Sequence, residues 1–485
     1  MKGFSVIVYI LSMSICAQID TGRLFMPSDI VYKGAFKLPG KSGTSQWRYG
    51  GGALTFNPHG DPGGKVDGYP GSLFGVGHIY QNHVSEISIP APLVSTNYDD
   101  LPVATTLQPF ADITQGLMNM DQGPASADRL GGLQYMPDGS IFWAAYKYYY
   151  VMPEDMNGFG ISTSTLSSPN AGGLWHAGSY HSIFTTDYLF LIPQWWADQY
   201  APGTNVIGGR ARSSGRGHQS EGPPFYAIEV PAGSPANGTI LPAVRLAFYS
   251  PGSDEWPDYK MVNQYFAGAW LEAGNKSSII VTATEGGSDC YGSAVDCNDL
   301  CGGNKGSHGY PYTHRLLFYD PMALGKVAQG HMQPNEVMPY HVEDLDNRLF
   351  WNNNCRNGIE ALAYDRDNGI IYAFQYRSDK PVIHVWSIAH LIPAAVDEHG
   401  QKANLVAVTI TVNPNPGRSS FAVRIRGNEN TGIRAGVYDI NGRLYYRISN
   451  RAYFTCNADA WPSGMYIVRV ETAGRVLSRR LVIQK

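Results

Sequence analysis

The sequence is poor in charge, and the charge that it has is unevenly divided. Asp, Glu, Lys and Arg make up 16% of its 485 residues, and the formal net charge is -4. Residues 404–485 contain 12 basic and 4 acidic side chains, which leaves residues 1–403 with 24 basic against 36 acidic ones, a net charge of -12. An acidic body of this kind does not suit a polyanion. We therefore expect no nucleic-acid partner.

The sequence also lacks long apolar runs, except for one at its N-terminus. Lys2 is followed there by an apolar stretch of about a dozen residues and by small residues near Ala17, the pattern of a secretory signal. This stretch is too short to span a bilayer as a helix. We expect residues 1–17 to be a signal peptide and the mature chain to have no transmembrane segment.

Glycine, proline and tyrosine are abundant, with 55, 31 and 31 residues, and this composition indicates an all-β fold of short strands joined by tight turns. Segments that begin at residues 52, 132, 268 and 360 each contain a strand, a polar turn and a second strand, and a further strand follows. The segment "TTDYLFLIPQWW" is expected to belong to one more such unit. Repeated hairpins with outer strands are typical of propeller blades. We predict that residues 18–400 form a β-propeller of five to seven blades, with a β-sandwich assembly as the alternative.

The last part of the chain, residues 405–485, has a different composition and shows clear strand alternation. The segments "VYDINGRLYYRI" and "SGMYIVRVETAGRVLSRRLVIQK" predict hairpins of a small β-sandwich. Together with "NPNPGRSSFAV", they closely resemble the type A C-terminal sorting domain of the type IX secretion system. The resemblance implies a Bacteroidetes-type bacterium, passage through the periplasm, contact with the type IX machinery, and release or anchoring at the outer surface.

Several segments of the body, among them "YKGAFKLPG" and "YPYTHRLLFYDP", resemble secreted bacterial β-propeller proteins without assigned activity. This second resemblance spans most of residues 30–390. It implies a fold, and it names neither a reaction nor a substrate.

Three of the six cysteines lie in the stretch "DCYGSAVDCNDLCGGNKGSH". Thiolate ligands and half-cystines have similar spacings, but an exported protein meets oxidising conditions, which favour disulfides over a zinc site. We predict two disulfides that pin an insertion at the channel mouth. Three connectivities are possible among Cys290, Cys297, Cys301 and Cys355, and Cys456 is left over.

The functional site of a propeller is usually formed by loops and strand ends at one mouth of its channel. The catalytic candidates are polar residues in such places: His78, Arg210, Arg216, His218 and Glu285. The Gly-rich stretch from Arg210 to His218 could serve a polysaccharide lyase by neutralising a uronate carboxylate, but we expect it to be a solvated, mobile insertion. A hydrolase needs two facing carboxylates, and no spacing in the sequence pairs them.

Aromatic residues offer stacking surfaces for sugars, and the candidates are Tyr149, Trp195, Trp196 and Tyr310. The stretch "NGIEALAYD" is similar to one in calcium-binding, phytase-like propellers, and this resemblance implies that Glu360 could be a calcium ligand. No other cofactor is expected. We predict an exported propeller that binds carbohydrate or another extracellular ligand, with a polysaccharide-degrading lyase or hydrolase as the alternative.

Overall fold

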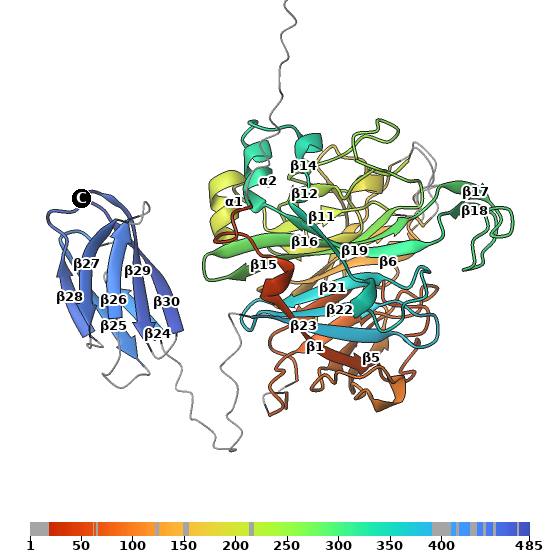
Figure 1. Ribbon diagram of the computed structural model, residues 1–485, viewed down its shortest axis with the longest axis horizontal. Helices are drawn as coiled ribbons and strands as arrows, with labels where there is room; N and C mark the ends of the chain where they lie inside the picture. The colour runs from red at the N-terminus through yellow and green to blue at the C-terminus, as the bar shows by residue number, and fades with distance from the viewer. Residues whose placement is uncertain are drawn as a thin grey trace, which may run out of the picture. The chain divides into compact units, whose positions relative to one another are not determined.

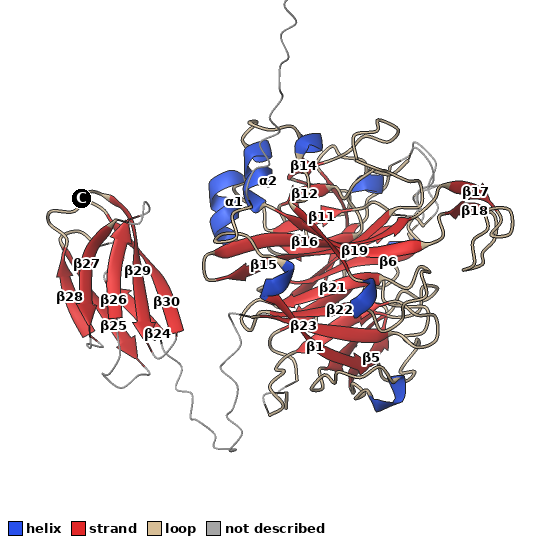
Figure 2. Ribbon diagram, in the orientation of Figure 1, coloured by secondary structure: helices blue, strands red, loops and turns tan. Residues whose placement is uncertain are grey.

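The computed structural model describes the chain except for residues 1–18, 62, 65, 121, 123–125, 149–154, 213–217, 390–408, 414–416, 427–433, 440–442, 450–452 and 473–474. The predicted signal peptide therefore lies outside the described residues. The chain divides into two compact units, Met1–Ile392 and Pro393–Lys485. The regular secondary structure of both is almost entirely β-strand (Figures 1 and 2), which confirms the all-β prediction.

Besides one two-stranded hairpin, the described residues of the first unit form five sheets of four or five strands, in which the strands of each hairpin run antiparallel. Four of them follow one another along the chain. The first comprises β2 (Leu54–Asn57), β3 (Ser72–Val76), β4 (Val84–Ser88) and β5 (Thr106–Ala111). The second comprises β6 (Arg129–Tyr135), β7 (Ser140–Tyr146), β8 (Phe159–Thr163) and β9 (Gly172–Ala177), with β13 (Ile240–Leu241) parallel to β9. The third comprises β10 (Tyr188–Leu191), β11 (Val206–Gly209), β12 (Phe225–Ile228) and β14 (Ala243–Ala247), and the fourth comprises β15 (Gln264–Ala273), β16 (Lys276–Gly286), β19 (Tyr312–Tyr319) and β20 (His341–Asp344).

The fifth sheet joins the two ends of the unit. It comprises β21 (Ile359–Asp365), β22 (Ile370–Gln375) and β23 (Val382–Ile388), and its outer strand is β1 (Ile30–Lys37) from the start of the chain. Strand β1 pairs antiparallel with β23, from Ile30 opposite Ile388 to Lys37 opposite Val382. The backbone hydrogen bonds of this pairing close the unit on itself.

One edge strand from each of the five sheets takes part in a closed ring of contacts. Strand β2 contacts β6, β6 contacts β10, β10 contacts β15, β15 contacts β21, and β21 contacts β2. We call these five the inner strands. Sheets that stack in this way around an axis are the arrangement expected of propeller blades, and we use the word blade for each of the five sheets, while the number of blades stays a prediction.

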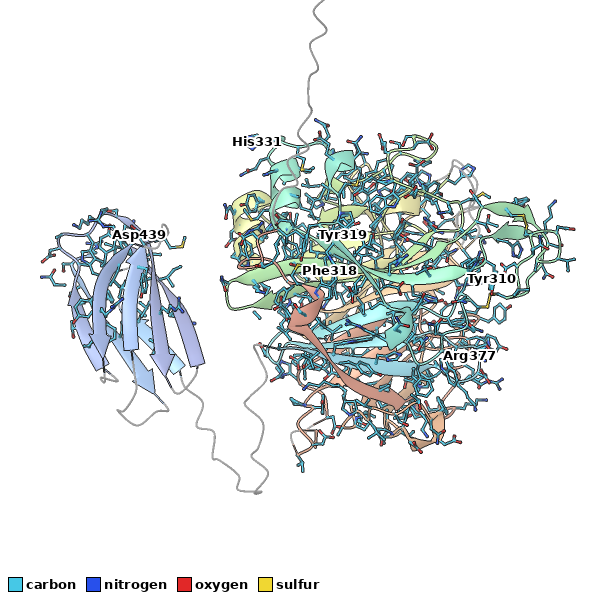
Figure 3. All side chains as sticks on the ribbon, viewed as in Figure 1. Tyr310, Phe318, Tyr319, His331, Arg377 and Asp439 are labelled. Atoms are coloured by element: carbon cyan, nitrogen blue, oxygen red, sulfur yellow. A yellow bond between two sulfur atoms is a disulfide. The ribbon has the colours of Figure 1, made fainter. Side chains whose placement is uncertain are left out.

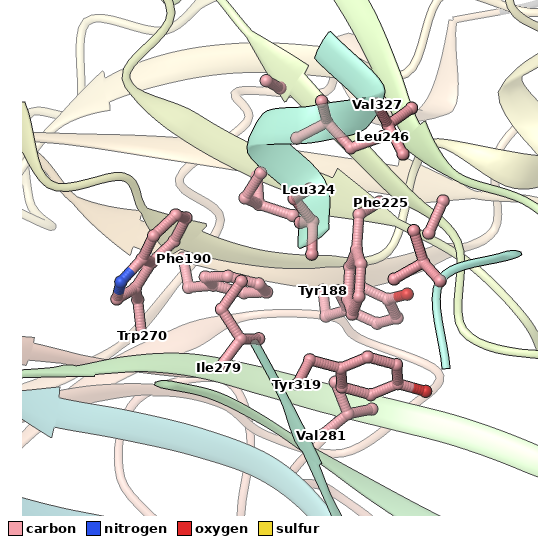
Figure 4. Close-up of a cluster of buried hydrophobic side chains, with 14 of the residues drawn as sticks. Tyr188, Phe190, Phe225, Leu246, Trp270, Ile279, Val281, Tyr319, Leu324 and Val327 are labelled. Atoms are coloured by element: carbon pink, nitrogen blue, oxygen red, sulfur yellow. The ribbon is translucent and has the colours of Figure 1, made fainter. Parts of the chain in front are cut away.

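The spaces between neighbouring sheets are filled with large apolar side chains. Figure 4 shows one such core, in which Phe190 and Phe225 of one sheet pack against Trp270 and Tyr319 of the next. Gly268 on β15 permits this packing, because a Cβ at that position would lie 2.4 Å from Cε1 of Phe190. The two sheets can therefore approach closely at this position because the inner strand has no side chain there.

Helices are few and short. Helix α1 (Gln194–Tyr200) connects β10 to β11, and α2 (Pro321–Ala328) connects β19 to β20. Turns of 3-10 helix lie at Pro27–Asp29, Tyr98–Asp100, Leu117–Asn119, Ser182–Phe184, Pro334–Glu336 and Asp346–Arg348. Within the described part of the chain, no helix has the length and apolar character needed to cross a membrane.

The second unit is a small sandwich of two sheets, as predicted. One sheet comprises β24 (Thr409–Asn413), β25 (Ser420–Arg426) and β28 (Tyr453–Asn457), and the other comprises β26 (Arg434–Asp439), β27 (Leu444–Ser449), β29 (Gly464–Thr472) and β30 (Arg475–Ile483). Buried side chains from both sheets share one core, which includes Phe421, Val437, Val468 and Leu481. Cys456 is a free thiol buried in this core.

Candidate functional site

Two cavities lie along the axis of the ring, and both are lined by residues of all five inner strands. The cavity near the carboxyl ends of these strands has a volume of about 330 Å³, whereas the one near their amino ends has only about 10 Å³. The amino ends of the inner strands lie together at one end of the ring. We call this end the channel mouth. Helices α1 and α2 lie at the other end of the strands, and the hairpin β17 (Cys290–Gly292) and β18 (Gly306–His308) projects at the mouth (Figure 1).

A buried ionic cluster fills the axis just below the mouth. Nε of Arg212 lies 2.6 Å from Oδ2 of Asp187, and Nη2 of the same arginine donates hydrogen bonds to Oδ1 of Asp187 and to the carbonyl of Gly52. Nη1 of Arg212 is 4.0 Å from Oε2 of Glu360, whose side chain is 22% exposed. The guanidinium of Arg210 lies over the Tyr146 ring. These contacts make the cluster part of the scaffold.

Burial shifts the pKa values of this cluster. It raises the pKa of Asp187 to about 6 and that of Glu360 to about 7, although the nearby charge of Arg212 opposes both shifts. Burial also lowers the pKa of Arg210 to about 10. For Arg212, burial is outweighed by the charge of Asp187, so its pKa is raised. Glu360 therefore faces a firmly charged cation.

A larger cavity, of about 1060 Å³, lies beside the channel mouth. We call it the mouth cavity. The β17–β18 hairpin and the loop that joins its strands form one wall. The other lining residues lie at and just before the start of β15 and in loops from three other sheets. The lining side chains that carry polar or aromatic groups are Tyr148, His218, Gln219, Gln264, Tyr291, Asp299, Asn304, Lys305, Ser307, His308, Tyr312, Arg356 and Asn357.

Two disulfides hold this wall in place. Cys290 on β17 is bonded to Cys297 in the hairpin loop, and Cys301 is bonded to Cys355 in the segment that precedes β21. All four predicted half-cystines are thus paired, which confirms the disulfides and selects one of the three connectivities. The second bond fastens the hairpin loop to the segment that precedes β21, and both of its cysteines line the cavity.

A hydrogen-bond network around Asp299 fixes the floor of the cavity. Oδ2 of Asp299 lies 2.9 Å from Nδ1 of His308 and accepts a hydrogen bond from the hydroxyl of Tyr312, while Oδ1 accepts from the backbone N–H of Cys301. Burial opposes ionisation here, but these hydrogen bonds outweigh it and lower the pKa of Asp299. Nη2 of Arg356 donates to the same Tyr312 hydroxyl.

The rim of the cavity presents side chains to solvent. Tyr148 is 48% exposed and Tyr291 is 61% exposed, and His218 is exposed as well. Nζ of Lys305 lies 5.9 Å from the centre of the Tyr291 ring. Exposed aromatic faces beside a cation and several amides give the cavity both stacking surfaces and hydrogen-bonding groups.

The comparison with protein families identifies the second unit. The model of the secretion system C-terminal sorting domain matches residues 411–484. Residues 411–484 are a type IX sorting domain. This domain addresses the chain to the cell surface or the extracellular space and implies contact with the type IX secretion machinery, as the sequence predicted.

Other comparisons say little about the body to which the sorting domain is attached. No curated protein matches the chain. A solved structure named as the extracellular domain of a one component system from B. thetaiotaomicron is 10% identical, covers 90% of this chain and 58% of its own, and has a TM-score of 0.23. Dimeric latent PorU from Porphyromonas gingivalis is 9% identical over 71% of this chain and 31% of its own, with a TM-score of 0.15. At such low TM-scores, neither likeness carries weight for fold or function.

Among the described catalytic and ligand-binding candidates, His218 alone lies in the lining of the mouth cavity, together with the predicted half-cystines Cys301 and Cys355. His78 instead packs against the rings of Tyr49 and Tyr80, and Glu285 lies 3.6 Å from Arg315. Tyr310, labelled in Figure 3, lies between β18 and β19 and does not line the cavity. Tyr149 and Arg216 lie outside the described residues.

Two expectations about exposure differ from what the structure contains. Trp196 is fully buried and donates a hydrogen bond to the carbonyl of Pro321, so it offers no stacking face, whereas its neighbour Trp195 is 42% exposed. Arg210 was expected in a solvated loop, but it is 1% exposed because backbone carbonyls and the Tyr146 ring accept its charge. Trp195 lies on α1, at the end of the strands opposite the mouth.

Calcium was the one cofactor considered, through Glu360. Among the described residues, no group of three or more His, Cys, Asp or Glu side chains could hold a metal ion. The charged group beside Glu360 is the guanidinium of Arg212. An arginine side chain therefore lies next to the carboxylate that the resemblance implied as a calcium ligand.

Sequence reasoning missed Tyr291, Lys305, Arg356 and Asn357 as lining residues. The first two lie inside the cysteine-rich stretch, where the sequence predicted a role for the cysteines but not for these two side chains. The last two follow Cys355, so the predicted disulfide was the one signal that could have placed them beside Tyr291 and Lys305.

Proposed function

We propose that this exported protein binds carbohydrate and that the mouth cavity is its binding site. The observation that carries the proposal is the combination, around one cavity of about 1060 Å³, of exposed Tyr148 and Tyr291 with amides such as Asn304 and Asn357. Sugar rings stack on aromatic faces, and their hydroxyl groups both donate and accept hydrogen bonds, which side-chain amides can match.

The arrangement supports binding better than hydrolysis. A glycoside hydrolase of the usual kind needs two carboxyl groups about 5 to 10 Å apart across the scissile bond. Among the described residues that line the cavity, Asp299 is the single carboxylate, and it is 6% exposed. Its oxygen atoms already accept hydrogen bonds from Tyr312 and from the backbone of Cys301.

A lyase receives little support from the stretch that suggested it. Arg210 is buried beside Tyr146 and Arg212 is paired with Asp187, so neither can reach a bound uronate. His218 remains as an exposed imidazole at the rim. Turnover of a polysaccharide is therefore the alternative outcome that the test must detect.

The test uses the mature full-length chain with a panel of immobilised neutral and acidic polysaccharides. We expect retention on at least one polymer, without release of reducing ends and without the ultraviolet absorbance of an unsaturated sugar. Tyr291→Ala should weaken binding by roughly 3- to 10-fold, the scale of one aromatic contact. Tyr80→Ala is the matched control, because Tyr80 is 75% exposed but does not line the cavity.

Three results would contradict the proposal. Retention on none of the polymers would refute carbohydrate binding, and equal losses in Tyr291→Ala and Tyr80→Ala would place the site elsewhere. Release of reducing ends or unsaturated products would show an enzyme, in which case binding would be only its first step.

A further inference from the structure

The lining of the mouth cavity contains two cations and a single carboxylate among the described residues. Some cations elsewhere on the body have carboxylate partners, as Arg366 has in Glu272 at 3.1 Å. Arg356 and Lys305 both line the cavity, and within the described part of the chain neither forms an ion pair with a carboxylate. These two cations without an ion pair belong to a stretch of chain, residues 1–403, whose net charge is -12.

Arg356 is held rigidly without being neutralised. Its Nη2 donates hydrogen bonds of 2.7 Å to the carbonyl of Ser307 and 3.0 Å to the hydroxyl of Tyr312, and its guanidinium lies 4.8 Å from the centre of the Tyr312 ring. Among the described residues, Nη1 has no hydrogen-bond partner. The half-buried cation is therefore positioned while part of its donor capacity stays free.

The one lining carboxylate does not cancel this charge. Asp299 is buried, and its carboxylate is already hydrogen-bonded to His308, Tyr312 and the backbone N–H of Cys301. A ligand in the cavity would meet Lys305 at the exposed rim and Arg356 deeper inside. A neutral ligand that covered Arg356 would remove water from a cation and offer no counter-charge, which costs free energy.

We infer that the mouth cavity selects acidic polysaccharides, whose carboxylate or sulfate groups are bound by Lys305 and Arg356. This inference rests on the proposed function and narrows its ligand class. Hydrogen bonds between a cation and an oxyanion are stronger than neutral ones. The Tyr291 ring beside Lys305 supplies a stacking face next to the charge, which suits a sugar ring that carries an acidic group.

The experiment measures, by isothermal titration calorimetry, binding of the mature full-length chain to three polymers: polygalacturonate, a sulfated galactan and a neutral galactan. We expect at least one acidic polymer to bind about 10-fold or more tightly than the neutral one, with affinity that falls as salt is added. Lys305→Glu should weaken that binding by about 10-fold or more. Lys326→Glu is the matched control, because Lys326 is an exposed lysine on α2, at the opposite end of the strands.

The outcomes separate the two proposals. Preference for polygalacturonate assigns a carboxylate ligand, and preference for the sulfated galactan assigns a sulfate ester. Equal affinity for the neutral galactan would overturn the inference and leave carbohydrate binding intact. No change in Lys305→Glu, or the same loss in Lys326→Glu, would also overturn it, because acidic polymers would then bind outside the cavity. Binding to none of the three polymers or of the wider panel would refute the proposed function itself.

Discussion

The disulfide between Cys301 and Cys355 should contribute more to the stability of the body than the one between Cys290 and Cys297. The first bond joins residues 54 apart in the sequence, and the loop that it closes contains β19 and β20. The second joins residues 7 apart within the hairpin. Loop-closure entropy gives ~4 kcal/mol for the longer loop and ~2 kcal/mol for the shorter one. Removing the longer bond should therefore cost about twice as much free energy of unfolding.

The assay is equilibrium unfolding of the full chain in guanidinium chloride, followed by tryptophan fluorescence. Nine of the ten tryptophans lie in the first unit, so the signal reports mainly on the body. The two variants to compare replace both cysteines of one bond by alanine, which leaves the other bond intact. The longer bond also holds one wall of the mouth cavity, so its removal should weaken polysaccharide binding as well.

One result would refute this reasoning. This result is that loss of the Cys301–Cys355 bond costs no more free energy of unfolding than loss of the Cys290–Cys297 bond. In that case, closing the longer loop does not restrict the unfolded chain more than closing the shorter one. The strands β19 and β20 would then be ordered by their sheet alone. Unchanged binding in the same variant would show that the hairpin keeps its place without the bond.

Three further predictions concern the cluster, the core and the export signal. Because burial raises the pKa of Glu360 to about 7, the folded state binds more protons than the unfolded one between about pH 5 and 7, so the free energy of unfolding should fall as pH rises through that window. Glu360→Gln should flatten this slope, as measured by unfolding at a series of pH values. Trp196→Ala should destabilise the body by about 3–5 kcal/mol, since it empties a fully buried site, whereas Trp195→Ala should cost far less in the same unfolding assay. Deletion of residues 411–484 should leave a folded body inside the cell envelope, and its appearance in the culture medium or on the surface would contradict the role of the sorting domain.

Much of the fold could be predicted because its signals are local. Each hairpin that was identified, such as the one that begins near residue 132, joins the first two strands of a sheet, and "TTDYLFLIPQWW" contains β10, an inner strand. The alternation along a strand and the residues of its turn lie within about a dozen positions. The pairing of β1 with β23 was not predicted, because it joins residues more than 340 positions apart, and no short-range pattern records it.

Burial along a short helix was harder to predict than strand pairing. Trp195 and Trp196 are neighbours in sequence and looked equivalent as stacking surfaces. On α1 they point about 100° apart, so that one meets Pro321 in the core and the other reaches solvent. The expected helix content was low, and without a helix the two side chains could not be told apart.

The candidate site was predicted least well, because its parts come from separate blades. Its residues lie near positions 148, 218, 262, 300 and 356, and the closure of the ring together with one disulfide brings them together. Each segment alone resembles an ordinary polar loop. The cysteines were the exception, since their expected oxidation required that Cys355 lie beside the cysteine-rich stretch.

The residues on the axis explain why we place the proposed carbohydrate site beside the ring of inner strands and not at its centre. Near the amino ends of the inner strands, the described residues leave a cavity of only about 10 Å³, which is about the space of one water molecule. Arg212, Asp187 and Glu360 meet at this level, and separating Arg212 from Asp187 would leave a buried charge without a partner, at a cost of about 3–5 kcal/mol. A sugar ring entering the axis would have to break that pair. The mouth cavity offers a much larger space with no such cost, and its wall is an insertion fastened by disulfides. Changes in that insertion can therefore alter the ligand while the ring that supports it stays the same.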